Sequence, residues 1–214
     1  MFCKPSIVPS KTPETSGGPE AEDAMDPKRV RVLNAALQAA LAYGYHRTTM
    51  DDVARAAQMS RPALYLLFKN KTDIFRAVAS RMFEQILQRM EEALQGPGTL
   101  GERLFTGIDT AMIGAMCSIT ESPHGAEIMD LKSELAGDLV QNWHNRLSEL
   151  FRDAIQAEIG RSGVDLRQRG LSTDTLAELL VDGLEGMKMR TGNADAQRSG
   201  ARQLVRVIEL AIER

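Results

Sequence analysis

Two closely spaced helix starts, at Thr49 and Ser60, constrain the fold of this 214-residue chain more than any other feature. Asp52 follows Thr49 at the third position, a relative of the capping box, and Ser60 stands before Arg61 and Pro62 as an N-cap does. Only a few residues separate the two short helices. A turn of that length between short helices is typical of a helix-turn-helix, which we predict here.

Helical periodicity extends on both sides of this pair, and no strand-like alternation competes with it. A first helix is punctuated by Asp26 as cap, Pro27 at its first position and Gly44 after its end. Its predicted inward face, at helical spacing, is formed by Val30, Leu33, Leu37, Ala40 and Leu41. Further helices are predicted at about 72–95, 101–120, 123–131, 134–159, 173–190 and 194–213. The fold class is therefore all-α.

The composition divides the chain into three parts. Residues 1–24 are rich in Pro, Ser, Thr and Gly and are predicted to be a disordered tail, with a start at Met25 as the alternative. Residues 25–71 form a predicted three-helix helix-turn-helix domain, and residues 72–214 form a predicted helical bundle. The helix at about 72–95 connects the two.

Charge is distributed unevenly between these parts. Residues 26–81 hold ten Lys and Arg against four Asp, a net charge of +6, whereas the chain from Met82 onward holds 14 basic and 21 acidic residues, a net charge of −7. A basic segment joined to an acidic remainder suggests that one end meets a polyanion. Charge alone is equally compatible with solvated helix faces that differ in sign.

The helix after Ser60 is predicted to have an anchoring side and a displayed side. At 100° per residue Leu64, Leu67 and Phe68 share the inward side, while Tyr65 and Leu66 point outward. Leu66 is expected to pack on a neighbouring loop, with contact to a thymine methyl group as the alternative. Outward polar residues on such a helix reach bases and phosphates in a major groove. The residues of this kind predicted to bind DNA are Thr48, Thr49, Ser60, Arg61, Tyr65, Lys69 and Lys71.

The stretch TTMDDVARAAQMSRPALYLLFKNKTDIFRAV resembles the DNA-binding domain of the tetracycline-repressor (TetR/AcrR) family of bacterial transcriptional regulators. The paired threonines, the Ser before the recognition helix, and the LY..F, KNK and D.F elements are in register, and the resemblance spans roughly residues 26–90. The remainder matches in helical architecture only. One departure is Gln58, which stands where the family commonly has glycine, so the turn is expected to be strained or built differently.

The resemblance implies a homodimer that binds a palindromic operator, most simply as a repressor, and is released from DNA by a small-molecule effector. It also implies that Pro62 and Ala63 are DNA-binding residues that lie against the groove, and that residues 72–214 are the effector-binding and dimerisation domain. In that scheme the helix at 72–95 transmits a ligand-induced tilt to two recognition helices spaced about 34–36 Å apart. The alternatives are an activator or ligand-independent regulator and, from another class, a helical small-molecule sensor or protein-interaction adaptor without sequence-specific DNA binding.

Two further groups of residues are candidates for the second half of the chain. An apolar effector pocket is predicted at Met112, Met116, Cys117, Ile119, Met129 and Trp143, although for each residue taken singly an ordinary core position is the favoured interpretation. A dimer interface is predicted at Leu176, Leu180, Gly183, Leu184, Met187, Leu204, Val207, Ile208 and Ala211, where a hairpin inside one protomer would show the same pattern.

The sequence lacks the signatures of catalysis or of a resident ion. It contains no phosphate-binding glycine loop, nucleophile elbow or metal-binding helix, so we expect neither an enzyme nor a cofactor or metal site. Cys3 and Cys117 lie far apart, and no apolar run approaches the roughly 20 residues of a membrane span. We expect a cytoplasmic protein that does not contact a membrane.

Overall fold

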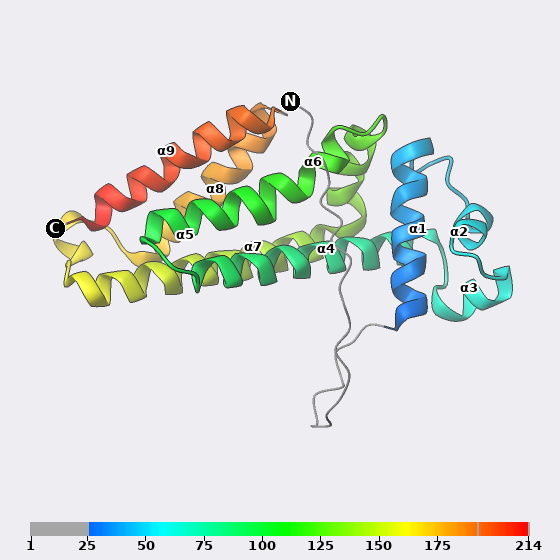
Figure 1. The fold of residues 1–214 in the computed structure, drawn as a ribbon, viewed down its shortest axis with the longest axis horizontal. Helices are drawn as coiled ribbons and strands as arrows, with labels where there is room; N and C mark the ends of the chain where they lie inside the picture. The colour runs from blue at the N-terminus through cyan, green and yellow to red at the C-terminus, as the bar shows by residue number, and fades with distance from the viewer. Residues whose placement is uncertain (1–25, 192, 214) are drawn as a thin grey trace, which may run out of the picture.

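The computed structural model describes residues 26–191 and 193–213 and is all-helical over that range (Figure 1). The tail predicted at residues 1–24 lies outside the described residues. α1 to α3 form one end of an elongated molecule, and the long helices α4 and α7 run from that end beneath α5, α6, α8 and α9. The predicted fold class is confirmed.

The three N-terminal helices begin at the residues that the caps predicted, and the first ends where Gly44 predicted. α1 (Pro27–Tyr43) starts after Asp26, whose carboxylate accepts from the Lys28 N–H at 2.9 Å, and ends at Gly44 with φ of 90°. α2 (Met50–Ala56) and α3 (Arg61–Leu67) follow. The predicted face of α1 is rotated, because Val32 and Ala36 are fully buried whereas Val30 and Leu37 are half-buried. α1 has neighbours on several sides, contacting α2, α4 and α7.

The turn between α2 and α3 is built without glycine. Gln58 adopts φ of 55°, the one positive φ of a non-glycine residue among the residues described. The Gln58 N–H donates to the Arg55 carbonyl at 3.1 Å, and the Met59 N–H donates to the Ala54 carbonyl at 3.0 Å. These two bonds are the Schellman arrangement, which normally places glycine at the left-handed position. The expected strain is therefore present, at an exposed side chain.

The rest of the described chain forms a bundle around α4 (Lys71–Leu94) and α7 (Gly125–Ser162). The other members are α5 (Leu100–Gly107), α6 (Gly114–Thr120), α8 (Thr173–Arg190) and α9 (Ala194–Ile212), with a 3-10 turn at Leu166–Arg169. α7 replaces the two helices predicted at 123–131 and 134–159. Its backbone breaks at Ala136, with φ of −140° and ψ of 28°, a few residues beyond the predicted gap.

A π-helical segment, Ile108–Ile113, joins α5 to α6 within the single helix predicted at 101–120. It follows a point where α5 packs tightly on α4, since a Cβ on Gly107 would collide with the Met90 sulfur. The segment is itself largely buried, with Ile108, Met112 and Ile113 facing inward. π-helical turns are rare and are found frequently at functional sites.

Two apolar cores share the helix α4. The first packs α1, α2 and α3 against Ile74 and Phe75, and the second extends from Phe83 along α4 into the bundle. Ile128 and Leu135, on the first segment of α7, pack against the first core. The kink at Ala136 thus separates a part of α7 that supports the N-terminal helices from a longer part that lies along α4.

Candidate functional site

The exposed face of α3 carries side chains that are candidates for contact with DNA. Leu64 is fully buried beneath it, whereas Arg61, Pro62 and Tyr65 are exposed. Leu66, which was expected to pack on a loop, is 88% exposed, so that expectation is wrong. An outward leucine beside a tyrosine and an arginine is suited to an apolar contact such as the methyl group of thymine.

Arg61 is held in place by neighbours on two helices. Its Nε lies 3.1 Å from Asp51 Oδ1 and its Nη1 donates to Asp51 Oδ2 at 3.2 Å, while its guanidinium carbon lies 5.7 Å from the centre of the Tyr65 ring. The hydrogen bond with Tyr65 and the Asp51 charge raise the pKa of Arg61. Exposed ion pairs contribute little stability, so a stronger anion can replace Asp51. Arg61 is therefore oriented but available.

Thr49 and Ser60 act as the caps that the sequence predicted. The Thr49 hydroxyl accepts from the Asp52 N–H at 3.2 Å, and Asp52 accepts from the Thr49 N–H at 3.0 Å in a reciprocal capping box. The hydrogen bonds from Thr49 lower the pKa of Asp52. Ser60 accepts from the Ala63 N–H at 3.3 Å. Ala63 is half-buried and Lys69 is exposed.

Two of the predicted DNA-binding residues are engaged inside the protein. Thr48 is 2% exposed and its hydroxyl donates to the Gly44 carbonyl at 2.7 Å, so it is not available to a phosphate. The Lys71 ammonium donates to the Tyr45 carbonyl at 2.9 Å and lies 4.1 Å from the centre of that ring. Burial lowers the pKa of Lys71. Both residues stabilise the turn after α1 instead of lying free on the surface.

A cavity of about 370 Å³ lies among α6, α7, α8, α9 and the π-helical segment, and it is called the larger cavity to distinguish it from a neighbouring one of about 60 Å³. Four of the predicted effector-pocket residues line it: Met112, Met116, Cys117 and Met129. Further lining that the sequence did not predict comes from α8 and α9, and includes Leu184, Met187, Lys188 and Gln197. Its walls are mostly apolar, as expected for a small-molecule site.

Two of the six predicted pocket residues lie elsewhere. Trp143 is buried in the bundle core, stacked on Phe83 with ring centres 5.3 Å apart, and Ile119 faces the N-terminal helices. Lys188 connects Trp143 to the larger cavity, because its ammonium lies 5.0 Å from the Trp143 ring centre and donates to Glu185 at 2.7 Å. Lys188 and Gln197 supply the larger cavity with polar side chains from α8 and α9.

Polar contacts hold the first segment of α7 against the N-terminal helices. The His46 N–H donates to Glu127 Oε1 at 2.9 Å, and this bond lowers the pKa of Glu127. On α4, Arg76 donates to both carboxylate oxygens of Asp138 at 2.9 and 2.6 Å and to the Leu135 carbonyl at 2.6 Å. The turn after α1 and the start of α4 are therefore both fastened to α7.

The predicted dimer residues divide into three groups by exposure. Five of them are buried in the core of the protomer and are not available to a second copy: Leu176, Leu180, Leu184, Met187 and Ile208. Gly183, Leu204 and Ala211 are partly covered, and Gly183 packs against Leu204. Val207 is 59% exposed. Other large apolar side chains exposed on α8 and α9 are Leu179, Met189 and Leu210.

Within the described part of the chain, no three His, Cys, Asp or Glu side chains gather as a metal site would require. His124 lies 3.5 Å from Glu127, and His144 lies 3.2 Å from Glu185. None of the described helices combines the length and apolarity that spanning a bilayer requires.

Comparisons with known proteins agree with this arrangement. Residues 32–78 match the family model described as bacterial regulatory proteins, tetR family. The chain is also 30% identical over 129 residues to the uncharacterized HTH-type transcriptional regulator TtgW of Pseudomonas putida, a match that covers 60% of this chain and 91% of TtgW.

The chain belongs to the TetR family. This TetR-family member is a ligand-responsive, DNA-binding transcriptional regulator, and its relatives are transcriptional regulators, not enzymes. It is 24% identical over 151 residues to the fatty acid metabolism regulator protein of Bacillus subtilis (strain 168), covering 66% of this chain and 75% of that protein. The fatty acid degradation regulator FadR from Bacillus halodurans shares the fold, with a TM-score of 0.60 at 18% identity over 86% of this chain and 96% of that one.

Proposed function

We propose that this regulator is a cytoplasmic repressor that binds a palindromic operator as a homodimer and leaves it in response to an aliphatic effector that binds in the larger cavity. The observation that carries the proposal is the family match over the helix-turn-helix, joined to an exposed Arg61 and Tyr65 on α3. The division of labour is that proposed from the sequence, with residues 25–71 reading DNA and 72–214 binding effector and partner.

In the proposed contact, Arg61 exchanges Asp51 for a guanine and Tyr65 donates its hydroxyl to a phosphate. Thr49, Ser60, Pro62, Ala63 and Lys69 face the same groove, while Thr48 and Lys71 act indirectly by fixing the turn after α1. Leu66 adds an apolar contact. Asp51 then competes with the DNA for Arg61. Replacement of Asp51 by a neutral residue also removes a negative charge that repels the DNA phosphates.

Selection of duplexes from a random library, followed by fluorescence anisotropy at fixed salt, tests this contact. Arg61→Ala is expected to lose about 1–3 kcal/mol and to relax preference at one base position, while Tyr65→Phe weakens all sequences alike. Asp51→Asn is expected to bind the selected duplex more tightly than wild type does. The exposed Arg202→Ala, on α9, serves as the charge-matched control. Unchanged base preference in Arg61→Ala would refute the assignment of α3 as the reading helix.

Exposed apolar side chains on α8 and α9 support the proposed homodimer. Leu179, Met189, Val207 and Leu210 are each at least half exposed, and a groove containing Gly183, Gly186 and Gly200 lies on the same pair of helices. Side chains of this kind are candidates for an interface with a second copy. Val207→Arg is expected to give a monomer in sedimentation analysis, and a dimer that survives this change would contradict the proposal.

The larger cavity and the named relatives support an effector with a linear aliphatic chain. The lining holds three methionines besides Met187, and methionine adapts to flexible apolar ligands. A relative and a solved structure are described as regulators of fatty acid metabolism and degradation. Lys188 and Gln197 are placed to receive a polar head group. Isothermal titration calorimetry with saturated fatty acids and, separately, with their coenzyme A thioesters shows whether the free acid or the thioester is bound. If neither binds, this effector class is refuted.

A further inference from the structure

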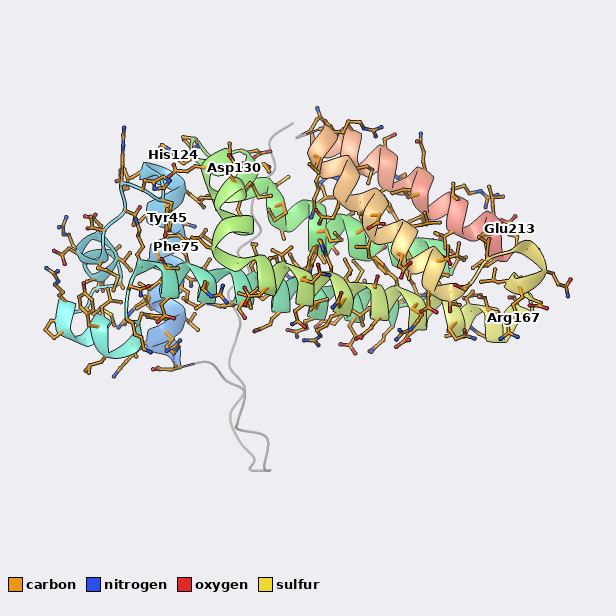
Figure 2. All side chains as sticks on the ribbon, turned by 180° about the vertical axis from the view of Figure 1, so that it is seen from behind. Tyr45, Phe75, His124, Asp130, Arg167 and Glu213 are labelled. Atoms are coloured by element: carbon orange, nitrogen blue, oxygen red, sulfur yellow. The ribbon has the colours of Figure 1, made fainter. Side chains whose placement is uncertain are left out.

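A second, smaller cavity lies between the N-terminal helices and the bundle. This joint cavity, of about 60 Å³, is lined by apolar side chains that include Leu37 of α1, Phe75 of α4, Ile119 of α6 and Ile128 of α7, together with Tyr45 from the turn after α1. Tyr45 stands edge-on to Phe75 with ring centres 4.9 Å apart. Figure 2 shows both rings beside α1, next to the first segment of α7 that begins after His124.

Met129 borders both cavities. It lines the larger cavity from α7 and also lines the joint cavity, so the two voids meet at one side chain. Methionine is unbranched and has three rotatable bonds, so it can move aside without a change in the backbone. No charged side chain stands with it in the joint cavity lining.

The polar side chains on one side of the larger cavity set the orientation of a bound aliphatic effector. Lys188 and Gln197 come from α8 and α9, whereas α7 contributes Gly125, Ala126 and Met129. An amphipathic effector with its head group near Lys188 therefore directs its apolar end towards α7. On the far side of Met129, the lining of the joint cavity provides further apolar surface for the end of the effector.

We propose that the end of a long aliphatic effector displaces Met129, enters the joint cavity and forces the N-terminal helices away from α7. Occupation of the larger cavity alone binds the effector, and entry into the joint cavity releases DNA. Chain length is therefore what the regulator senses. This inference rests on the aliphatic effector proposed above.

The joint cavity is about one-sixth the size of the larger cavity, so a chain end that enters it widens the joint. This widening separates α7 from the turn after α1 and from the start of α4. The contacts that join them are the hydrogen bond from the His46 N–H to Glu127 and the bonds from Arg76 to Leu135 and Asp138. The same turn carries the Tyr45 carbonyl that holds Lys71. A displacement there changes the position of α1 and of the reading helix that packs on it.

The experiment uses saturated fatty acids from octanoic to stearic acid, each below its micelle concentration, on the full-length regulator. Binding is measured by calorimetry and DNA release by fluorescence anisotropy of the selected duplex. In the wild type, affinity is expected to rise by about fourfold per added methylene until the chain is fully buried. Release is expected only above a threshold length.

Met129→Phe should close the passage, and Met116→Phe, at a residue that lines only the larger cavity, is the control of matched size. In Met129→Phe we expect the rise in affinity to stop at a shorter acid and the concentration of long acid that releases DNA to increase about tenfold or more, while decanoic acid binds as to wild type. Met129→Ala should lower the threshold length. Met116→Phe should weaken all acids without moving the threshold.

Each remaining outcome has a distinct meaning. Release that parallels binding at every length would overturn the joint-cavity mechanism and leave the aliphatic effector intact. A threshold that Met129→Phe and Met116→Phe shift equally would do the same. Failure of every acid to bind the wild type would overturn the effector class and this inference together.

Discussion

Replacement of Gln58 by glycine should make the regulator more stable, although it removes a side chain and adds nothing. The backbone at this position has φ of 55°, in the left-handed region that costs a non-glycine residue about 1–2 kcal/mol. Glycine removes that strain, but it also increases the conformational entropy of the unfolded chain, which lowers the free energy of unfolding by about 0.4–1 kcal/mol. The net expectation is a gain of about 0.5 kcal/mol.

A series at this one position separates backbone strain from loss of the side chain. Gln58→Ala keeps the Cβ and should stay close to wild type, because the Gln58 side chain is exposed. Gln58→Val adds a β-branched side chain in the left-handed region and should be destabilised by about 1 kcal/mol. The Schellman bonds from Gln58 and Met59 constrain the backbone in each case.

Urea unfolding measured by circular dichroism gives the order of stability, and thermal unfolding checks it. About 0.5 kcal/mol corresponds to roughly 1–2 °C for a chain of this size. Stabilities in the order glycine, glutamine, valine support the strained turn. A glycine variant less stable than wild type, or a valine variant equal to it, would refute the reasoning, since neither result is compatible with a positive φ that costs energy.

Three further changes test other parts of the fold. Leu64→Ala empties a fully buried position beneath α3, so it should cost about 2–5 kcal/mol in urea unfolding and abolish DNA binding; unchanged unfolding would contradict the core assignment. Arg169→Gln removes a guanidinium that donates to carbonyls at the end of α9, at 2.7 and 2.6 Å from Ala211 and Glu213, and should cost about 1 kcal/mol, with hydrogen exchange increased over the last turn. Arg76 lowers the pKa of Asp138 to about 2, so this carboxylate contributes stability above about pH 4 that is lost as the pH falls through about 2. Asp138→Asn should flatten the stability profile in that acid range, and an unchanged profile would argue against the ion pair.

Local signals in the sequence predicted the helices well. Asp26, Thr49 and Ser60 each cap the helix that follows, because capping depends on hydrogen bonds within a few residues and so leaves a trace in the sequence. The rotated face of α1 was not predictable in this way. Leu37 faces the joint cavity and Val32 the first core, and a helix with neighbours on several sides has no single apolar stripe.

The errors at the candidate sites come from contacts between segments distant in the sequence. Lys71 has the residue type and place of a phosphate ligand, but its ammonium is held by the Tyr45 carbonyl. Thr48 bonds back to Gly44. The larger cavity draws residues from α6 to α9, and Lys188 belongs to it only because α8 folds beside α7. These contacts join segments that are distant in the sequence, so the spacing of residues along the chain does not predict them.

The π-helical segment at Ile108–Ile113 also bears on how this chain compares with shorter relatives. A π turn is equivalent to one residue inserted into an α-helix, and the insertion is absorbed locally. Deletion of one residue there would restore regular α-helical bonding and leave α6 in the same rotational phase relative to α5. Met116 and Cys117 would keep facing the larger cavity. Within this segment, a single-residue gain or loss therefore changes the length of the chain without reorienting the wall that α6 contributes to the larger cavity.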